Sequence, residues 1–463
     1  MQRGKNELAL SVDEIVGATG AQLLSSGEGT YFTGACTDSR VAGPGSIFFA
    51  LKGEQTDGHL FVRSAVGKGA SMCVVEHINP DIQETIDAGK CCILKVQDSL
   101  TALQALARFY REKFPEIKMV GITGSSGKTT TKELTASVLS KLGSTVCSKG
   151  NLNSEIGLPL SMFNIRSHHK FGVFEMGINH KGEMDALVGV LHPQIGVVTN
   201  IGTAHIGNMG SQDNIAIEKG KIFSANSALE AGFVCENDMY ADYLQHQVGE
   251  RDYFTYGASM ASDFELKGTA GSEFTFGDER IHFPLMGKYN FQNAMAAAAV
   301  GRYLGASDRQ IKEALEGAST MFGRGELFKA GGVDVLCDCY NANLEAVMAV
   351  VDFAAEAASS VSRVVFVLGS LLEQGDESDS IHAKIGRKLS YSDAAGIFLF
   401  GDEMKAAYDA LAEAGKDAFW SPEYEALEKA VIDFVKPGDL VVVKGSRGMA
   451  MERIVEKLKS RGK

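Results

Sequence analysis

The sequence predicts an α/β protein that folds into three domains with parallel sheets. Its 463 residues exceed the usual size of one domain, which is about 100–200 residues. Short apolar runs alternate with helical stretches through the middle and the last third of the chain, as in parallel sheets covered by helices. Over residues 118–140 a strand-like run leads into a glycine-rich turn and then a helix, which is typical of a phosphate-binding unit.

Residues 1–98 predict a small N-terminal domain of mixed α/β type. The runs at residues 46–52 and 71–76 are apolar and rich in aromatic or β-branched side chains, so each predicts a strand. Residues 60–66 between them predict a helix.

Residues 99–318 predict a central ATP-binding domain of the phosphate-loop type. A helix is expected from Ser99 to Phe114, because apolar residues recur on one face and Pro115 follows. A β-rich insert is expected around residues 252–284, before an alanine-rich helix over 290–304. The parallel strands expected before the insert lie at 118–120, 171–176, 195–200 and 232–236.

Residues 319–463 predict a C-terminal, doubly wound, Rossmann-like domain with its own core. The segment Gly323-Arg-Gly lies at the junction and predicts a hinge. Four apolar runs predict its strands, with helices between them, at 333–337, 364–368, 396–400 and 440–444.

Composition excludes several classes of protein. The net charge of −13 and pI of about 5.3 lack the basic footprint of a nucleic-acid-binding protein. The N-terminal residues lack a signal-peptide core, and no apolar run approaches the roughly 20 residues of a membrane span. The eight cysteines form no CxxC pair, which favours reduced thiols over a disulfide framework. We therefore expect a cytoplasmic protein.

The segment Gly121-Ile-Thr-Gly-Ser-Ser-Gly-Lys-Thr-Thr130 predicts a triphosphate site. Glycines allow backbone N–H groups to approach an anion, and the helix after the turn adds its dipole. Lys128 is expected to reach the outer phosphates, and the Thr129 hydroxyl to bind Mg²⁺. Counted from Gly124, the spacing is GxxGKT, a shorter loop than the usual GxxxxGK[ST].

Other polar residues come directly after predicted strands, where open α/β sheets place ligands. Glu175 ends an apolar strand, and a carboxylate there is costly unless it is paired or binds a metal. Asn200 and His205 come after the next strand, and Lys219 lies in a helical pattern. Each has a plain structural alternative: a solvated strand end for Glu175, a structural hydrogen bond for His205 and a solvated helix position for Lys219.

Two C-terminal loops also carry polar clusters. The segments 338–343, Asp-Cys-Tyr-Asn-Ala-Asn, and 444–448, Lys-Gly-Ser-Arg-Gly, each come directly after an apolar strand. Such loops commonly bind ligands, although a solvated turn is the alternative for both.

Together these segments resemble the Mur ligase family through all three predicted domains. The loop at 123–130 is similar to the nucleotide loop of that family. The segment Lys149-Gly-Asn-Leu-Asn-Ser-Glu-Ile-Gly-Leu-Pro159 resembles a substrate-contacting segment, and Thr37-Asp-Ser-Arg40 and residues 50–59 resemble its uridine-substrate region.

Within the family, Tyr340-Asn-Ala-Asn343 and residues 443–452 are most similar to the branch that joins D-Ala-D-Ala to UDP-N-acetylmuramoyl-tripeptide. The branch that adds a single diamino acid usually carries Asp-Asn-Pro and Arg near its amino-acid site, and these are absent here. Three departures from the pattern stand out. Tyr289 replaces a common His, Ser370 replaces an acidic residue after Gly369, and Leu344 stands where Pro is frequent.

The resemblance implies ATP-dependent amide formation through an acyl phosphate, as a step of peptidoglycan precursor synthesis. It implies ATP and two Mg²⁺ ions, with Lys128, His205 and Lys219 as catalytic residues and Lys219 carbamylated by CO₂. Metal ligands are expected to be Thr129, Glu175, His205 and Lys219. The residues expected to contact ATP are Gly124, Ser125, Ser126, Gly127, Lys128, Thr129, Thr130, Asn290, Asn293, Arg324 and Asp338.

The resemblance also implies the partners, which are UDP-N-acetylmuramoyl-tripeptide and D-Ala-D-Ala, with no nucleic acid, no membrane span and a monomeric chain. The third residue of the tripeptide, meso-diaminopimelate or lysine, stays open. The residues expected to contact these substrates are Ser39, Arg40, Lys52, Asn151, Asn153, Tyr340, Asn341, Asn343, Lys444, Ser446 and Arg447.

Two alternative functions fit the sequence less well. A folylpolyglutamate synthetase would share the central and C-terminal plan, but the N-terminal segments Asp38-Ser-Arg and Ala50-Leu-Lys-Gly argue against it. A nucleotide-binding regulator or ATPase motor should carry a full GxxxxGK[ST] loop and usually a strand ending in Asp-Glu, and this chain has neither.

Overall fold

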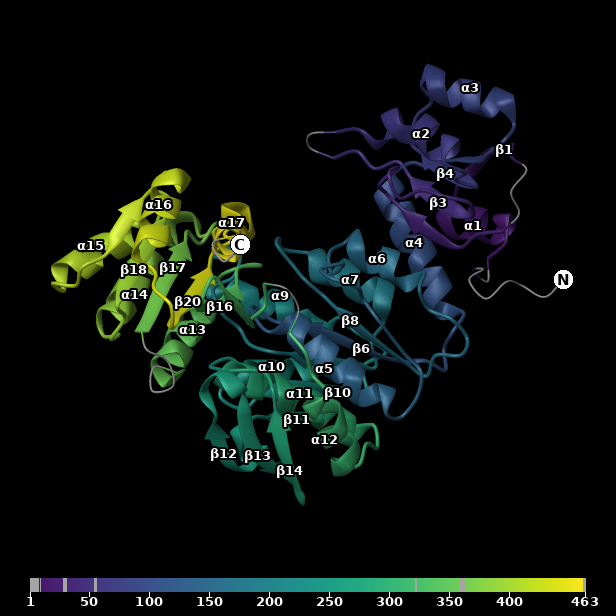
Figure 1. Ribbon diagram of the computed structural model, residues 1–463. Helices are drawn as coiled ribbons and strands as arrows, with labels where there is room; N and C mark the ends of the chain where they lie inside the picture. The colour runs from purple at the N-terminus through teal and green to yellow at the C-terminus, as the bar shows by residue number, and fades with distance from the viewer. Residues whose placement is uncertain are drawn as a thin grey trace.

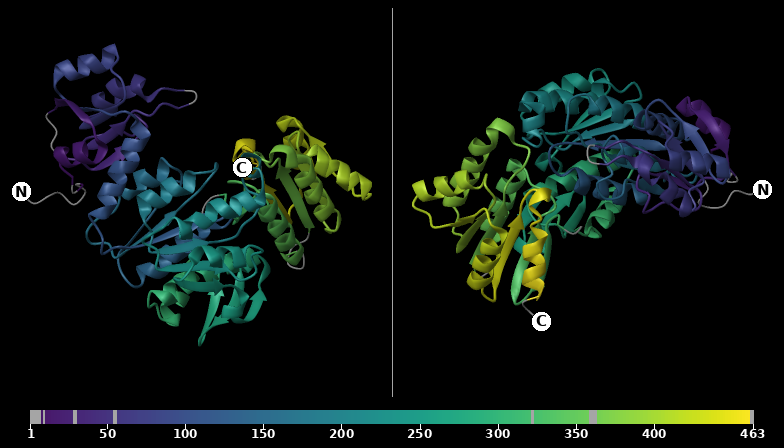
Figure 2. Two further views of the ribbon diagram at one scale, coloured as in Figure 1. Left: turned by 180° about the vertical axis from the view of Figure 1, so that it is seen from behind. Right: turned by 90° about the horizontal axis from the view of Figure 1, so that it is seen from above.

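The computed structural model describes residues 8, 10–27, 31–53, 56–320, 323–357 and 363–460. Its sheets fall into three regions that succeed one another along the chain: N-terminal, central and C-terminal (Figures 1 and 2). In Figure 1 the N-terminal region lies at the upper right, the C-terminal region at the left, and the central region between them. The predicted α/β architecture of three domains is confirmed.

The N-terminal region is a five-stranded sheet in the order β1-β5-β4-β3-β2, in which only β1 runs antiparallel to its neighbour. The strands predicted at 46–52 and 71–76 are β3 and β4, and the helix predicted at 60–66 is η1 together with α2. The elements are α1 Val12–Thr19, β1 Gln22–Ser26, β2 Gly34–Cys36, β3 Ser46–Phe49, η1 Gly58–Phe61, α2 Val62–Gly67, β4 Met72–Val75, α3 Pro80–Ala88 and β5 Cys92–Lys95.

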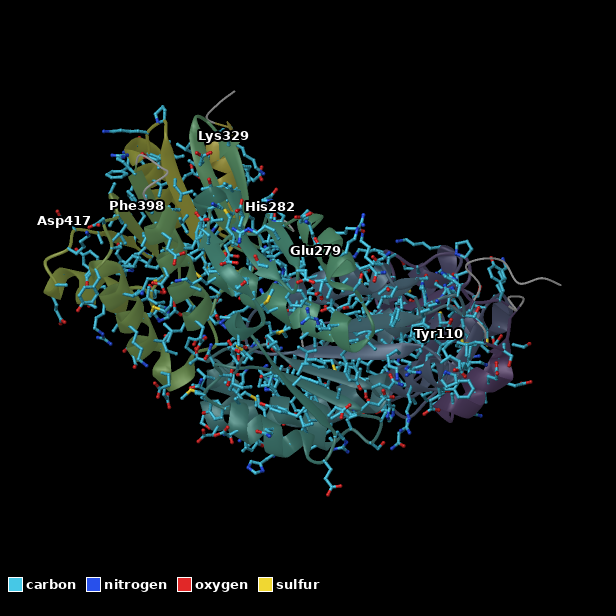
Figure 3. The ribbon with its side chains drawn as sticks, turned by 90° about the horizontal axis from the view of Figure 1, so that it is seen from below. Tyr110, Glu279, His282, Lys329, Phe398 and Asp417 are labelled. Carbon is cyan, nitrogen blue, oxygen red and sulfur yellow. The ribbon has the colours of Figure 1, made fainter. Side chains whose placement is uncertain are left out.

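Helix α4 (Ser99–Glu112) joins the N-terminal region to the central one. Asp98 caps its first turn by accepting from the Thr101 backbone N–H. Its buried face includes Leu106 and Tyr110, and the Tyr110 hydroxyl donates to the Ile165 carbonyl at 2.8 Å. Figure 3 shows Tyr110 where the two regions meet. Apolar residues of both regions form one continuous core around this helix.

The central region is a six-stranded parallel sheet in the order β11-β10-β9-β6-β8-β7. Strand β6 lies between β8 and β9. The next strands along the chain, β7 and β8, lie on one side of β6, and β9 lies on its other side. Open α/β sheets bind ligands at such a change of side, outside the carboxyl ends of the strands. The elements are β6 Lys118–Thr123, α5 Lys128–Ser140, β7 Thr145–Cys147, α6 Gly157–Met162, β8 Phe171–Glu175, α7 Glu183–Leu191, β9 Ile195–Val198, α8 Ile206–Met209, α9 Gln212–Ser224, β10 Ala231–Cys235, α10 Ala241–Val248 and β11 Asp252–Tyr256.

The β-rich insert expected at 252–284 is smaller than predicted, because β11 is an edge strand of the parallel sheet. After β11 the chain forms an antiparallel sheet in the order β12-β13-β14, seen at the bottom of Figure 1. Helix α11 then packs against α5. These elements are η2 Ala258–Met260, β12 Ser262–Leu266, η3 Gly268–Ala270, β13 Ser272–Phe276, β14 Glu279–Phe283, α11 Lys288–Tyr303 and α12 Asp308–Glu316.

The C-terminal region is a six-stranded sheet in the order β15-β16-β20-β17-β18-β19, parallel except for β15. Helices α13 to α15 pack on one face, and α16 and α17 on the other. Among the described helices, none is both long and apolar enough to cross a membrane. The elements are β15 Glu326–Ala330, β16 Val333–Asp338, α13 Leu344–Ala357, β17 Arg363–Gly369, η5 Gly375–Glu377, α14 Ser378–Ser390, β18 Gly396–Phe400, α15 Lys405–Glu413, β19 Phe419–Ser421, α16 Tyr424–Phe434, β20 Asp439–Lys444, η6 Arg447–Met449 and α17 Glu452–Ser460.

Candidate functional site: a phosphate loop between two regions

The predicted phosphate loop forms the turn between β6 and α5. Gly124 and Gly127 adopt φ angles of +145° and +78°, which disfavour other residues. A Cβ at Gly124 would lie 1.8 Å from the Thr199 hydroxyl, and one at Gly127 would lie 2.4 Å from the Asn293 side-chain oxygen. Helix α5 begins at Lys128, so the helix N-terminus faces the turn directly.

The segment after β9 braces this loop from the side. Asn200 accepts from the Ser126 N–H at 3.0 Å and donates to the Ser126 hydroxyl at 2.9 Å. The Ser125 hydroxyl accepts from the Gly202 N–H at 2.8 Å, and Thr199 donates to the Ser126 carbonyl at 2.6 Å. The sequence predicted that Asn200 follows a strand, but it did not predict a contact between Asn200 and the phosphate loop.

Glu175 lies beside the first turn of α5, at the end of β8. Its carboxylate is 2% exposed and accepts from the Thr129 hydroxyl at 2.7 Å and from the Asn153 amide at 2.6 Å. Both donors are neutral groups, so no cation among the described residues is hydrogen-bonded to this carboxylate. Carboxylate and hydroxyl oxygens are the ligands that Mg²⁺ prefers. Thr129 and Glu175, predicted as metal ligands, therefore have the chemistry and the proximity for that role.

Lys128, Lys219 and His205 form a group of basic side chains near Glu175. Lys219 is 1% exposed, and its ammonium makes no hydrogen bond to a residue that the structure describes. Burial, reinforced by Lys128, lowers the pKa of Lys219 well below its ordinary value, although Glu218 and Glu175 oppose that shift. The alternative that Lys219 is a solvated helix residue is therefore wrong.

Burial also lowers the pKa of the Lys128 ammonium and of the His205 imidazole. For Lys128, Arg324 adds to the effect of burial on the pKa and Glu175 opposes it. For His205, Lys128 and Lys219 add to the effect of burial on the pKa, and a hydrogen bond to Glu373 opposes it. Lys128 donates to the Gly124 carbonyl at 2.8 Å. Lys128 and Lys219 are destabilised as cations by burial, and Lys219 also by Lys128, so this place prefers an anion.

The C-terminal region adds a second polar cluster, where the loops after β16 and β20 meet. Asp338 and the buried Lys444 form an ion pair of 2.5 Å, and Lys444 also donates to the Asn341 carbonyl. The Arg324 guanidinium lies 4.1 Å from the Tyr340 ring centre. The Arg447 backbone N–H donates to the Asn341 side chain at 3.4 Å. The structure thus brings together these residues from the two predicted loops.

Two further hydrogen bonds connect residues of this C-terminal cluster to neighbouring loops. Asn343 donates to the Ser125 carbonyl at 3.3 Å, which joins the C-terminal region to the phosphate loop. The Ser446 hydroxyl accepts from the Leu372 N–H at 2.9 Å.

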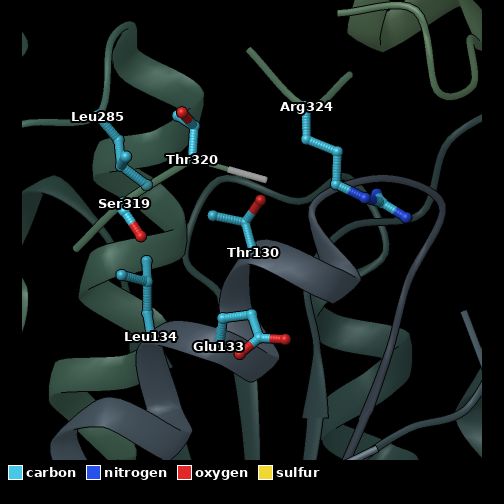
Figure 4. A pocket seen from close by; sticks show the side chains of 7 residues that line it. All are labelled: Thr130, Glu133, Leu134, Leu285, Ser319, Thr320 and Arg324. Atoms are coloured by element: carbon cyan, nitrogen blue, oxygen red, sulfur yellow. The ribbon is translucent and has the colours of Figure 1, made fainter. Parts of the chain in front are cut away.

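The residues predicted to lie near adenine are on α11. Asn293 accepts from the Thr131 hydroxyl at 3.2 Å, so it lies against the first turn of α5, and it donates to Asn290 at 3.2 Å. Tyr289, which replaces the common His, has a buried hydroxyl with no hydrogen-bond partner among the described residues. Beside α5 a pocket opens between the central region and the segment that leads into the C-terminal region (Figure 4). It is lined by Thr130, Glu133, Leu134, Leu285, Ser319, Thr320 and Arg324.

The residues predicted to contact the uridine substrate lie in the N-terminal region, away from the loop. Arg40 is largely exposed and pairs with Asp38 at 2.7 Å. Ser39 is buried and Lys52 is exposed. Asn151 is exposed on the segment after β7, where its carbonyl accepts from the Asn153 N–H. Asn153, two residues further on in the central region, donates to the Glu175 carboxylate and so contacts the candidate metal site.

Comparisons with known proteins agree along the whole chain. Residues 32–111 match the model described as "Mur ligase family, catalytic domain", residues 122–301 the "Mur ligase middle domain", and residues 323–447 the "Mur ligase, glutamate ligase domain". The UDP-N-acetylmuramoyl-tripeptide–D-alanyl-D-alanine ligase of Treponema pallidum is 37% identical over 96% of this chain and 98% of its own length.

Solved structures give the same result. MurF from Acinetobacter baumannii superposes with a TM-score of 0.87 at 29% identity, covering 98% of this chain and 99% of that one. MurF from Thermotoga maritima, crystallised in complex with ADP, superposes with a TM-score of 0.78 at 27% identity, over 92% of this chain and 97% of that one. From these matches and the loop geometry, we conclude that the chain belongs to the Mur ligase family.

Proposed function

We propose that this protein is an ATP-dependent ligase that joins D-Ala-D-Ala to UDP-N-acetylmuramoyl-tripeptide in peptidoglycan precursor synthesis. The observation that carries the proposal is a phosphate loop whose Thr129 is hydrogen-bonded to the buried Glu175, in a chain similar over nearly its full length to the T. pallidum ligase of that name. The ADP complex of the T. maritima relative supports ATP as the nucleotide.

The reaction has two steps. A carboxylate oxygen of the tripeptide attacks the γ-phosphorus of ATP, the bond to the bridging oxygen breaks, and ADP leaves. The amine nitrogen of D-Ala-D-Ala then attacks the acyl carbon, and phosphate leaves as the amide forms and the amine loses a proton. Both steps bring anionic groups together, so the site has to supply positive charge and keep water away from the acyl phosphate.

The residues near the loop suit that demand. Lys128 and the N–H groups from Gly124 to Thr130 would hold the phosphates. Thr129, Glu175, His205 and a carbamylated Lys219 would hold Mg²⁺, which supplies charge neutralisation between phosphate and carboxylate when bound. Asn290, Asn293, Arg324 and Asp338 would contact ATP from α11 and the C-terminal region.

The carbamate at Lys219 is part of the proposal. CO₂ reacts with a neutral amine, and the burial of Lys219 favours that form. The product is an anion placed among cations. We expect Lys219→Ala to lose ligation and to regain part of it when short carboxylates are added. Full activity of the unrescued Lys219→Ala protein would exclude the carbamate.

For the substrates, we propose that Ser39, Arg40 and Lys52 bind the uridine end and that Asn151 and Asn153 bind nearer the reacting carboxylate. Tyr340, Asn341, Asn343, Lys444, Ser446 and Arg447 would bind the dipeptide or shape its loop. The enzyme would act as a monomer in the cytoplasm, with domains at 1–98, 99–318 and 319–463.

Phosphate release tests the function. We expect ATP turnover only when UDP-N-acetylmuramoyl-tripeptide and D-Ala-D-Ala are both present, and comparing the meso-diaminopimelate and lysine tripeptides would define the donor. Robust joining of a free diamino acid to the UDP-dipeptide precursor would show instead that the chain belongs to the single-residue branch.

A further inference from the structure

Glu373 of the C-terminal region reaches across to His205 of the central region. Its Oε2 lies 2.6 Å from the His205 Nδ1, and its backbone carbonyl accepts from the Gly207 N–H at 3.0 Å. Glu345 of the same region accepts from the Thr203 N–H at 2.9 Å. Two carboxylates of the C-terminal region therefore hold the short segment that carries His205, one at Thr203 and one at His205 itself.

The backbone at this contact is held in an uncommon conformation. His205 and Glu373 have φ angles of +62° and +64°, and they are two of the five non-glycine residues with positive φ in the described part of the chain. A Cβ added to Gly207 would lie 2.7 Å from the Glu373 carbonyl oxygen. Strained backbone of this kind persists only where the surrounding structure enforces it, and it concentrates at functional sites.

The hydrogen bond determines which imidazole nitrogen is free. A carboxylate can only accept, so the Nδ1 of His205 carries the proton and donates to Glu373. In a neutral ring the lone pair then lies on Nε2. Histidines that bind metals commonly have this arrangement, in which a carboxylate receives the other N–H and fixes the ring orientation.

We propose that Glu373 is a positioning residue that holds His205 with Nε2 free to bind a divalent cation. Docking of the C-terminal region onto the central region and cation binding would then favour each other. This inference rests on the proposed metal role of His205. This mutual effect follows from thermodynamic linkage. A contact that exists only when the C-terminal region is docked strengthens cation binding in the docked state, and the bound cation stabilises the docked state by the same factor.

A purely stabilising role fits the contact less well. The Glu373 side chain is 51% exposed, and exposed ion pairs contribute little to folding stability. Glu373 is also the one acidic residue in the segment 368–375, where Ser370 stands in place of an acidic residue. Removal of its carboxylate should therefore alter cation binding while the fold persists.

Manganese binding tests the proposal. Mn²⁺ can be titrated by electron paramagnetic resonance into the full chain with a non-hydrolysable ATP analogue. Glu373→Ala should weaken one Mn²⁺ site by about 10–100-fold. Glu373→Gln, whose amide oxygen can still accept from Nδ1–H, should recover most of the affinity. Glu377→Ala removes an exposed carboxylate four residues away and should change nothing.

A second measurement reports the domain arrangement. Small-angle scattering of the wild type should show a smaller radius of gyration when Mn²⁺ and the analogue are added, and Glu373→Ala should reduce that change at equal Mn²⁺ concentration. Tighter Mn²⁺ binding by Glu373→Ala would mean that the carboxylate competes with the cation. That result, or unchanged binding, would overturn the proposal.

A parallel titration of His205→Ala separates this inference from the proposed function. If His205→Ala loses one Mn²⁺ site and Glu373→Ala does not, only the positioning role of Glu373 fails. If His205→Ala binds Mn²⁺ like the wild type, the proposed metal role of His205 fails, and the inference fails with it.

Discussion

The two junctions of the central region are built differently. On the N-terminal side, α4 carries Leu103, Leu106 and Tyr110 into a core that contains residues of both regions and is closed to water. On the C-terminal side, Met286 and Ile206 are the only described residues of the central region that join the apolar core of the C-terminal region, and the other contacts include the hydrogen bonds of Glu345 and Glu373.

The difference indicates which part of the molecule moves. Separation of the N-terminal region would expose a large apolar surface, which costs about 25 cal/mol for each Å². The C-terminal contacts can be exchanged for water at a small cost, because a hydrogen bond contributes only about 0.5–1.5 kcal/mol net. We therefore expect a fixed N-terminal junction and a C-terminal junction that opens and closes around ATP.

The largest expected effect is at the phosphate loop, on the polar side of this comparison. Lys128→Ala should lower the rate of ligation by at least about 10³-fold, or about 4 kcal/mol in the barrier, because the phosphates lose their cation. Thermal unfolding should stay close to that of the wild type, since the hydrogen bond of the Lys128 ammonium is to the Gly124 carbonyl of its own loop. Near-normal turnover at saturating ATP would contradict the triphosphate site.

The apolar junction should show the opposite behaviour. Leu106→Ala removes a fully buried side chain and should lower the free energy of unfolding by about 2–5 kcal/mol, as measured by urea denaturation. The kcat of the protein that remains folded should be unchanged. Leu60→Ala, at a side chain that is 65% exposed, is the control and should cost less than about 0.5 kcal/mol. Equal losses of unfolding free energy for the two variants would contradict the inference that the N-terminal junction depends on its apolar core.

Substitution of Lys219 should change stability and activity in opposite directions. Its pKa is lowered in the folded chain, so between the folded and the ordinary value the unfolded chain binds one more proton, and this group makes stability rise with pH. Lys219→Met should abolish ligation yet raise the melting temperature, about 2–4 °C for each kcal/mol gained.

The gain in melting temperature should be larger at pH 6 than at pH 9 in CO₂-free buffer. Lys181→Met, at an exposed position, should show no such pH dependence. A lower melting temperature for Lys219→Met at pH 6 would contradict the burial argument.

The smallest effect is expected at Glu345. Glu345→Ala removes its hydrogen bonds to Thr203 and should cost less than about 1 kcal/mol of stability. A double-mutant cycle with Thr203→Val, measured on the KM for ATP, should give a coupling of about 0.5–1 kcal/mol. No coupling would mean that the hydrogen bond from the Thr203 hydroxyl to Glu345 plays no part in closure.

Local patterns carried most of what could be predicted from the sequence. The loop from Gly124 to Lys128 is contiguous, and the strands of the parallel sheets are long apolar runs, so both have a signal in the chain itself. The edge strands β7 and β15 were not predicted, because β7 has only three residues and β15 carries polar side chains.

Long-range partners could not be predicted in the same way. Asn200 lies 74 residues from Ser126, and Glu373 lies 168 residues from His205. Such pairs depend on strand order and on how two regions meet, and residue spacing records neither. Resemblance to a family supplied candidate roles, whereas the contacts that hold the candidate residues became visible only in the structure.

The shared core around α4 also constrains the order in which the chain can fold during its synthesis. That core includes Leu94 in β5 and Leu244 and Val248 in α10, so its last members leave the ribosome about 150 residues after the N-terminal sheet has been made. At about 5–20 residues per second, this delay is about 8–30 s. During that time the shared core is incomplete and part of its apolar surface stays open to water, so we expect the nascent chain to be a client of ribosome-associated chaperones. The C-terminal region has its own core and needs no such wait.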